Sequence, residues 1–322
     1  MLFCVDNSGS MADKQGTLAK SFATFINQFK DKALDFHIGI VTTDTQNTSE
    51  AYWQSKLPNY VTPNRGRLLS RVAGEKWLSN DSQALVGKFQ TNAKVGTIGS
   101  GRESCFQSML YALDDSMIGA GGYNEGFLRE GALFAGIIVS DENEDMSHQY
   151  DGGDHDTTID MRIKRVQDRI AALKANVKIR DADWSFIINK TVGTQAKPYT
   201  YPLAEGLNPF PEVYTRAAEV FGSPTYNICP NRPNGNCYDG GAQSDFGGDL
   251  ATVGSNIITH AQSEYKLTYK PADISKIVVK MNGNVIAMDP ASGWSYDSAK
   301  NSVALASSID PSGATITIDY NY

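Results

Sequence analysis

Short apolar runs alternate with segments of helical periodicity along most of this 322-residue chain. Residues 36–41 and 133–139 are strand-like runs of this kind, whereas apolar residues recur at helical spacing in 13–31 and 246–262. Buried strands that alternate with helices are typical of a parallel sheet covered by helices on both faces. The sequence therefore predicts an α/β fold with a doubly wound, mostly parallel sheet over residues 1–262.

The pattern changes at about residue 263. Residues 277–281 and 285–288 read as two strands joined by Asn282-Gly283, which is typical of a β-hairpin with a type I′ turn. Further short segments with strand character follow. We therefore predict a small antiparallel all-β module over residues 263–322.

Composition limits the classes of function. Hydrophobic residues make up 41% of the chain and charged residues 20%, which is typical of a soluble globular protein. The net charge of −7 argues against nucleic acid as the main partner. No apolar run is long enough to cross a bilayer. Because the sequence starts inside the predicted first strand, we expect any targeting segment to lie outside it.

The four cysteines fall into two pairs. Cys229 and Cys237 bracket a loop with no helix or strand pattern, so we predict a disulfide between them, with two free thiols as the alternative. This disulfide indicates an oxidising compartment, and hence a secreted, periplasmic or outer-surface protein. Cys4 and Cys105 lie in strand and helix patterns and are predicted to be buried apolar fillers. A second disulfide between them is the alternative.

The most informative motif is Asp6-Asn7-Ser8-Gly9-Ser10, which follows the first strand and precedes the first helix. Asp6, Ser8 and Ser10 can offer oxygen atoms to one point, and Gly9 allows the backbone to turn tightly between the serines. Oxygen ligands with few charges suit Mg²⁺. The alternative is an ordinary polar turn with a good helix cap.

Two further carboxylates follow corresponding elements. Asp141 comes directly after the strand that contains 133–139, and Glu103 opens the helix before that strand. The carboxyl ends of parallel strands share one edge, so both carboxylates can converge on Asp6. We expect Asp6, Ser8, Ser10, Glu103 and Asp141 to bind one Mg²⁺, for which Ca²⁺ or Mn²⁺ could substitute.

Asp6-x-Ser8-x-Ser10 with the later Asp141 resembles the metal-ion-dependent adhesion site of von Willebrand factor A domains, over residues 1–262. The resemblance implies that the serines bind the metal directly and that both aspartates act partly through water. Many family members have a threonine on the middle loop. Residues 100–106 instead resemble the middle loop of integrin β-subunit domains, where a glutamate is the ligand, so this role passes to Glu103, with Thr97 and Ser100 as alternatives. The C-terminal module resembles those of bacterial surface adhesins.

Asp44, Glu142 and Asp145 are candidates for a flanking metal site, which integrin β domains also have. Glu142 and Asp145 belong to the run Glu142-Asn143-Glu144-Asp145, and such charge runs are more often solvated loops. Asp44 ends a strand, where a turn or helix cap is the ordinary role.

These features together predict a binding protein and not an enzyme. The resemblance implies metal-dependent adhesion to a protein or glycan on another cell or envelope surface, with a carboxylate of the partner completing the metal coordination. A Mg²⁺-dependent hydrolase or phosphatase is the first alternative, but the sequence contains no nucleophile elbow and no phosphate-binding loop. A structural envelope protein with a stabilising metal is the second.

Overall fold

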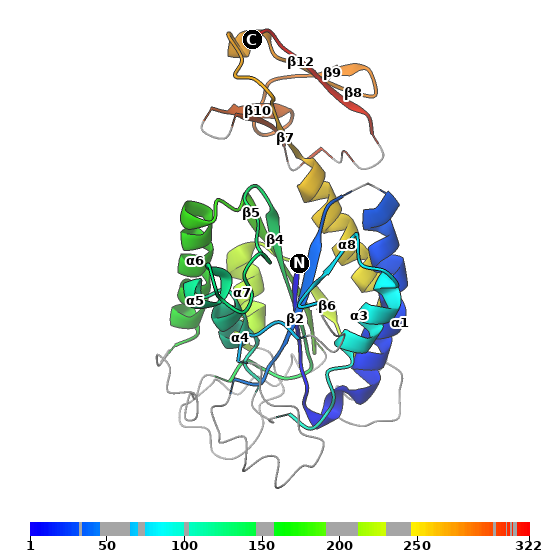
Figure 1. The fold of residues 1–322 in the computed structure, drawn as a ribbon. Coiled ribbons are helices and arrows are strands. Elements are labelled where there is room, and N and C mark those ends of the chain that lie inside the picture. The colour runs from blue at the N-terminus through cyan, green and yellow to red at the C-terminus, as the bar shows by residue number, and fades with distance from the viewer. Residues whose placement is uncertain are drawn as a thin grey trace. The chain divides into compact units, whose positions relative to one another are not determined.

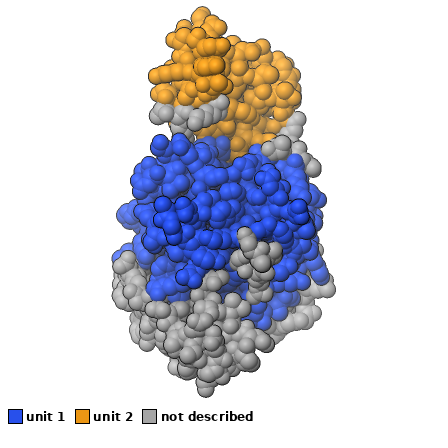
Figure 2. All heavy atoms as spheres, in the orientation of Figure 1, with its two compact units in different colours: residues 1–251 blue, residues 252–322 orange. Residues whose placement is uncertain are grey.

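The computed structural model describes most of the chain. The described part comprises residues 1–31, 34–45, 65–69, 75–99, 103–145, 158–190, 212–229, 246–298, 301–306, 308–309, 311 and 314–322. The chain divides into two compact units, residues 1–251 and residues 252–322 (Figure 2).

The first unit contains a six-stranded sheet in the order β3-β2-β1-β4-β5-β6. Its strands are β1 (Leu2–Val5), β2 (His37–Thr42), β3 (Leu78–Ser79), β4 (Leu133–Ser140), β5 (Asp181–Ile188) and β6 (Thr225–Asn227). All neighbouring strands are parallel except β3, which pairs antiparallel with β2 at the edge. The predicted doubly wound, mostly parallel sheet is confirmed.

Helices cover both faces of this sheet (Figure 1). One face carries α1 (Ala12–Asp31) and α3 (Leu85–Ala93), and the other carries α4 (Cys105–Ala112), α5 (Asp115–Ile118), α6 (Ile159–Asn176) and α7 (Glu212–Phe221). Strand β1 has a partner on each face because its side chains alternate. Phe3 packs against Phe25 and Phe89, at ring-centroid distances of 5.8 and 5.3 Å, whereas the side chain of Cys4 faces α4.

A disulfide joins Cys4 of β1 to Cys105, the first residue of α4. Both cysteines are fully buried, and their Cα atoms are 5.6 Å apart. The prediction that both are buried is confirmed, and the disulfide between them, which was the alternative to simple apolar packing, is present. Cys229 is also disulfide-bonded. Its predicted partner, Cys237, lies outside the described residues, so that pairing stays a prediction.

The second unit begins within α8 (Gly247–Gln262) and continues into two small sheets. Strands β7 (Glu264–Lys266), β10 (Trp294–Asp297) and β11 (Ser302–Leu305) form one sheet, and β8 (Val278–Met281), β9 (Asn284–Ile286) and β12 (Ile316–Asp319) form the other. Strand neighbours in both are antiparallel. Asn282 and Gly283 both have positive φ angles, 51° and 83°, as a type I′ turn requires. The predicted hairpin is thus confirmed.

In the described part of the chain, no helix is both long and apolar enough to cross a membrane.

Candidate metal centre at the ends of the parallel strands

The candidate site lies where the strand order of the sheet reverses. Strands β1 and β4 are neighbours, yet the chain leaves them toward opposite edges of the sheet. Such switch points leave a crevice at the carboxyl ends of the strands. Asp6 follows β1 and Asp141 follows β4, and the Asp6 amide donates a hydrogen bond to the Val139 carbonyl at 3.0 Å. The two carboxylates are therefore brought together at this edge, as the strand ends predict.

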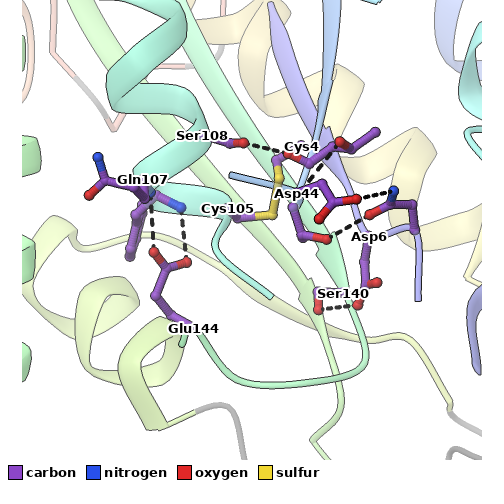
Figure 3. Close-up of a disulfide and its surroundings, with 12 residues drawn as sticks. Cys4, Asp6, Asp44, Cys105, Gln107, Ser108, Ser140 and Glu144 are labelled. Carbon is purple, nitrogen blue, oxygen red and sulfur yellow. Dashed lines mark hydrogen bonds between the residues drawn. A yellow bond between two sulfur atoms is a disulfide. The ribbon is translucent and has the colours of Figure 1, made fainter. Parts of the chain in front are cut away.

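Asp6 is fully buried, and its carboxylate organises the loop that follows it. Oδ1 accepts a hydrogen bond from the Ser8 amide at 2.7 Å. Oδ2 accepts one from the Ser140 hydroxyl, also at 2.7 Å (Figure 3). Both oxygens thus already have protein donors. A carboxylate held in this way suits contact with a metal through water better than direct coordination. Ser140 was missed by sequence reasoning, although its position at the end of β4 was a signal.

Ser8, Ser10 and Asp141 place three oxygen atoms in a continuous row. The two serine hydroxyls are 3.1 Å apart, and the Ser10 hydroxyl donates to Asp141 Oδ1 at 2.9 Å. Neighbouring ligands of an octahedral Mg²⁺ are also about 2.9 Å apart, because each lies about 2.1 Å from the ion. The hydrogen bonds therefore hold these oxygens at a spacing that a metal could use.

Glu103 is the least compensated carboxylate of the site. Its side chain is only 1% exposed, and neither carboxylate oxygen has a hydrogen-bond partner in the described part of the chain. Burial, and then the charges of Asp6 and Glu142, raise the pKa of Glu103 well above its usual value. The Thr43 hydroxyl opposes this rise in pKa, but it donates its hydrogen bond to Asn7 at 3.0 Å. A buried carboxylate without donors is costly unless a proton or a cation neutralises it.

The disulfide between Cys4 and Cys105 (Figure 3) links the loop that carries Glu103 to the strand that precedes Asp6, and the charge of Asp6 acts on Glu103. Asp6 lies two residues after Cys4, and Glu103 lies two residues before Cys105. In addition, the Ser104 amide donates to the Thr43 carbonyl at 3.3 Å, which anchors the same loop to the end of β2. The covalent link therefore holds the two carboxylate-bearing loops together.

The predicted flanking residues, Asp44, Glu142 and Asp145, lie near the same group of carboxylates. Asp44 is buried, accepts a hydrogen bond from Asn7 Nδ2 at 3.4 Å, and its charge contributes to the raised pKa of Glu103. Glu142 is 8% exposed, and burial with the charges of Asp6 and Asp141 raises its pKa to about 8. Asp145 is half-buried, and its amide donates to the Glu103 carbonyl. The prediction of a solvated loop is wrong for Glu142, because its carboxylate is buried against the other acids.

Glu144, in the same charge run, is buried for a different reason. Its carboxylate accepts hydrogen bonds from the Phe106 and Gln107 amides at 2.9 and 3.1 Å, so it caps the start of α4. It also accepts one from the Tyr214 hydroxyl at 2.8 Å and pairs with Arg162 at 2.5 Å. This network joins the loop after β4 to α4, α6 and α7. Its members come from distant parts of the sequence, and no local pattern indicates it.

The alternative ligands on the middle loop are only partly described. Thr97 is half-buried, in a segment that the Gly99 amide joins to the Asn7 carbonyl at 2.9 Å. Gln15 of α1 holds the same segment through hydrogen bonds with Gly96. Ser100 lies outside the described residues.

The pKa values of four carboxyl groups that are buried together, those of Asp6, Glu103, Asp141 and Glu142, are raised above their usual values. Burial, followed by the charge of Asp141, raises the pKa of Asp6 to about 7. Burial also raises the pKa of Asp141, although the nearby ammonium group of Lys14 opposes this rise. Among the described residues, no group of three or more His, Cys, Asp or Glu side chains has a ready metal-binding arrangement. A metal would therefore use serine oxygens and water as well as carboxylates, and these residues fit that mixture.

Comparisons with known proteins give limited help. No family model matches the chain, and no curated protein matches its sequence. Two crystal structures of the pilus adhesin SpaC from Lactobacillus rhamnosus GG, one of them an open conformation, are similar in structure at a TM-score of 0.40 and 8% identity. Each match covers 99% of this chain, but only 38% of the adhesin chain.

Proposed function

We propose that Asp6, Ser8, Ser10, Glu103 and Asp141 bind one divalent cation, Mg²⁺ by preference, and that the chain uses it to adhere to a partner that offers a carboxylate. The observation that carries the proposal is Glu103, which is buried among like charges with no donor for either oxygen among the described residues. A cation at this point would compensate the whole group. The available ligands are oxygen atoms alone, which favours Mg²⁺ over softer metals.

The residues of the site have different roles in this proposal. Ser8, Ser10 and Asp141 would offer direct ligands, since their oxygens already form a row. Asp6 would hold the loop through its two hydrogen bonds and contact the ion through water. When bound, Mg²⁺ would supply a coordination position for an outside carboxylate. Gly9 is exposed and Ser10 half-buried, so the serine loop lies at the surface, where such a partner can approach.

A location outside the cytoplasm accords with this proposal, because a buried disulfide links the two carboxylate-bearing loops. The partner would then be a protein or glycan on another cell or envelope surface. The ion would serve in binding and not in turnover.

The test measures metal binding and adhesion in the same variants. Calorimetric titration with Mg²⁺ of the wild type, Glu103→Gln and Asp6→Ala should show affinities at least about tenfold weaker in both variants. Glu130→Gln is the matched control, because Glu130 is 67% exposed. Circular dichroism should confirm that all variants are folded.

Adhesion is measured on candidate cell surfaces, with and without EDTA, and in competition with an aspartate-containing peptide and its asparagine counterpart. We expect EDTA and the aspartate peptide to abolish binding and the asparagine peptide to leave it intact. If the folded variants bind Mg²⁺ and cells as the wild type does, the proposal is wrong. Metal binding without any metal-dependent adhesion would instead identify a structural ion.

A further inference from the structure

Lys14 is a buried cation beside Asp141, one carboxylate of this acidic group. It lies near the start of α1, and its side chain is 0% exposed. Its Nζ is 3.1 Å from Asp141 Oδ2, 2.6 Å from the Ser10 carbonyl and 3.4 Å from Asp13 Oδ1. Taking an ammonium group out of water costs several kcal/mol unless its partners compensate it. A lysine in this position therefore calls for an explanation beyond packing.

Two of the three partners of Lys14, Asp141 and Ser10, are residues proposed to bind the metal. Asp141 divides its two oxygens, because Oδ1 accepts the Ser10 hydroxyl and Oδ2 faces the Lys14 ammonium. The backbone carbonyl of Ser10 accepts from the same ammonium. Lys14 of α1 therefore contacts one oxygen of Asp141, and Ser10 of the preceding loop contacts the other.

We infer that Lys14 is a built-in counter-cation that lowers the affinity of the site for its metal. This inference rests on the proposed function, because it assumes that the acidic group binds a divalent ion. Metal affinity at oxygen sites depends on the charge of the ligands. One fixed positive charge against Asp141 reduces the negative charge that a metal meets. The same contact compensates Asp141 when no metal is bound, so the metal-free fold is stabilised and the ion is exchangeable.

Neutralising Lys14 separates this role from ordinary packing. Lys14→Met keeps most of the side-chain volume and removes the charge. Lys88→Met is the control, because Lys88 is another helical lysine paired with a carboxylate, that of Glu75 at 2.5 Å, but its side chain is 21% exposed. Mg²⁺ affinity is measured by calorimetry at slightly alkaline pH, where protons compete least with the metal for carboxylates. Thermal unfolding is measured in EDTA and in excess Mg²⁺.

We expect Lys14→Met to bind Mg²⁺ at least about tenfold more tightly than the wild type. It should also unfold at a lower temperature in EDTA and gain more from added Mg²⁺. If Lys14→Met folds only when Mg²⁺ is present, the metal has replaced the ammonium group, which also supports the inference. The control should behave as the wild type does.

Two results would overturn the inference but not the proposed function. In the first, the wild type binds Mg²⁺ and the folded Lys14→Met variant binds it equally or more weakly. In the second, the wild type binds Mg²⁺ but Lys14→Met stays unfolded in excess Mg²⁺. If neither the folded wild type nor the folded variant binds Mg²⁺, the proposed function fails together with the inference.

Discussion

Glu142→Gln tests the electrostatic account of the site without requiring a known ligand. In the metal-free protein, burial and then the charges of Asp6 and Asp141 raise the pKa of Glu142 from 4.5 to about 8. The folded protein thus keeps this proton to a higher pH than the unfolded chain does. The associated stability is fully present below pH 4.5, and it is lost as the pH rises through about 8.

The size of the effect follows from that difference in pKa. Each pKa unit corresponds to about 1.36 kcal/mol, so a rise from 4.5 to about 8 costs about 4 to 5 kcal/mol once Glu142 is ionised. This is a large share of the roughly 5 to 15 kcal/mol that stabilises a typical domain. Glutamine has nearly the same shape and does not ionise. The variant should therefore match the wild type near pH 4.5 and exceed it by about 4 kcal/mol near pH 8.5.

The assay is urea unfolding of EDTA-treated wild type and Glu142→Gln across this pH range, with the exposed-site variant Glu130→Gln as control. Comparing variants at each pH cancels other titrating groups. In excess Mg²⁺ the difference in stability between the wild type and Glu142→Gln should become smaller, because a nearby cation favours the ionised form of Glu142.

A Glu142→Gln protein that is no more stable than the wild type at alkaline pH, in EDTA, would refute the reasoning. The acidic group would then relax in solution or admit water, and the crowding of charge that the structure shows would have no energetic consequence.

Two other predictions concern the supports of the site. Replacing both Cys4 and Cys105 by alanine opens a loop with a sequence separation of 101 residues, so urea unfolding should show a loss of about 3 to 5 kcal/mol; a loss below about 1 kcal/mol would contradict this. Arg162→Met leaves Glu144 buried without its cation, which should cost about 3 to 5 kcal/mol. Lys164→Met, on the same helix but at an exposed pair, should cost less than about 0.5 kcal/mol, and equal losses in the two variants would contradict the burial argument.

The fold could be predicted from the sequence because the patterns that specify its strands, helices and turns are local. Strand β4 is a continuous apolar run, and α1 repeats its apolar residues at helical spacing. Asn282-Gly283 alone specified the hairpin turn of the second unit. Each of these patterns depends on neighbours within a few positions.

Site residues could be predicted from the sequence only where they directly follow a predicted strand. Asp6 and Asp141 were placed at one edge because parallel strands share it. The pairing of Cys4 with Cys105, by contrast, spans 101 residues and has no local signature. Lys14 was overlooked because its role depends on Asp141, a residue far along the chain.

Glu103 and Glu144 show how the same fold treats two buried glutamates at the start of α4. Glu144 has two backbone amides, the Tyr214 hydroxyl and the Arg162 guanidinium as partners. Glu103 has no hydrogen-bond donor for either oxygen from any described residue and lies beside further carboxylates. The scaffold can therefore satisfy a buried acid when the acid serves structure. The fold supplies four partners to Glu144 but leaves both carboxylate oxygens of Glu103 without a hydrogen bond within the described structure, which is why we propose a divalent cation from outside the chain for Glu103.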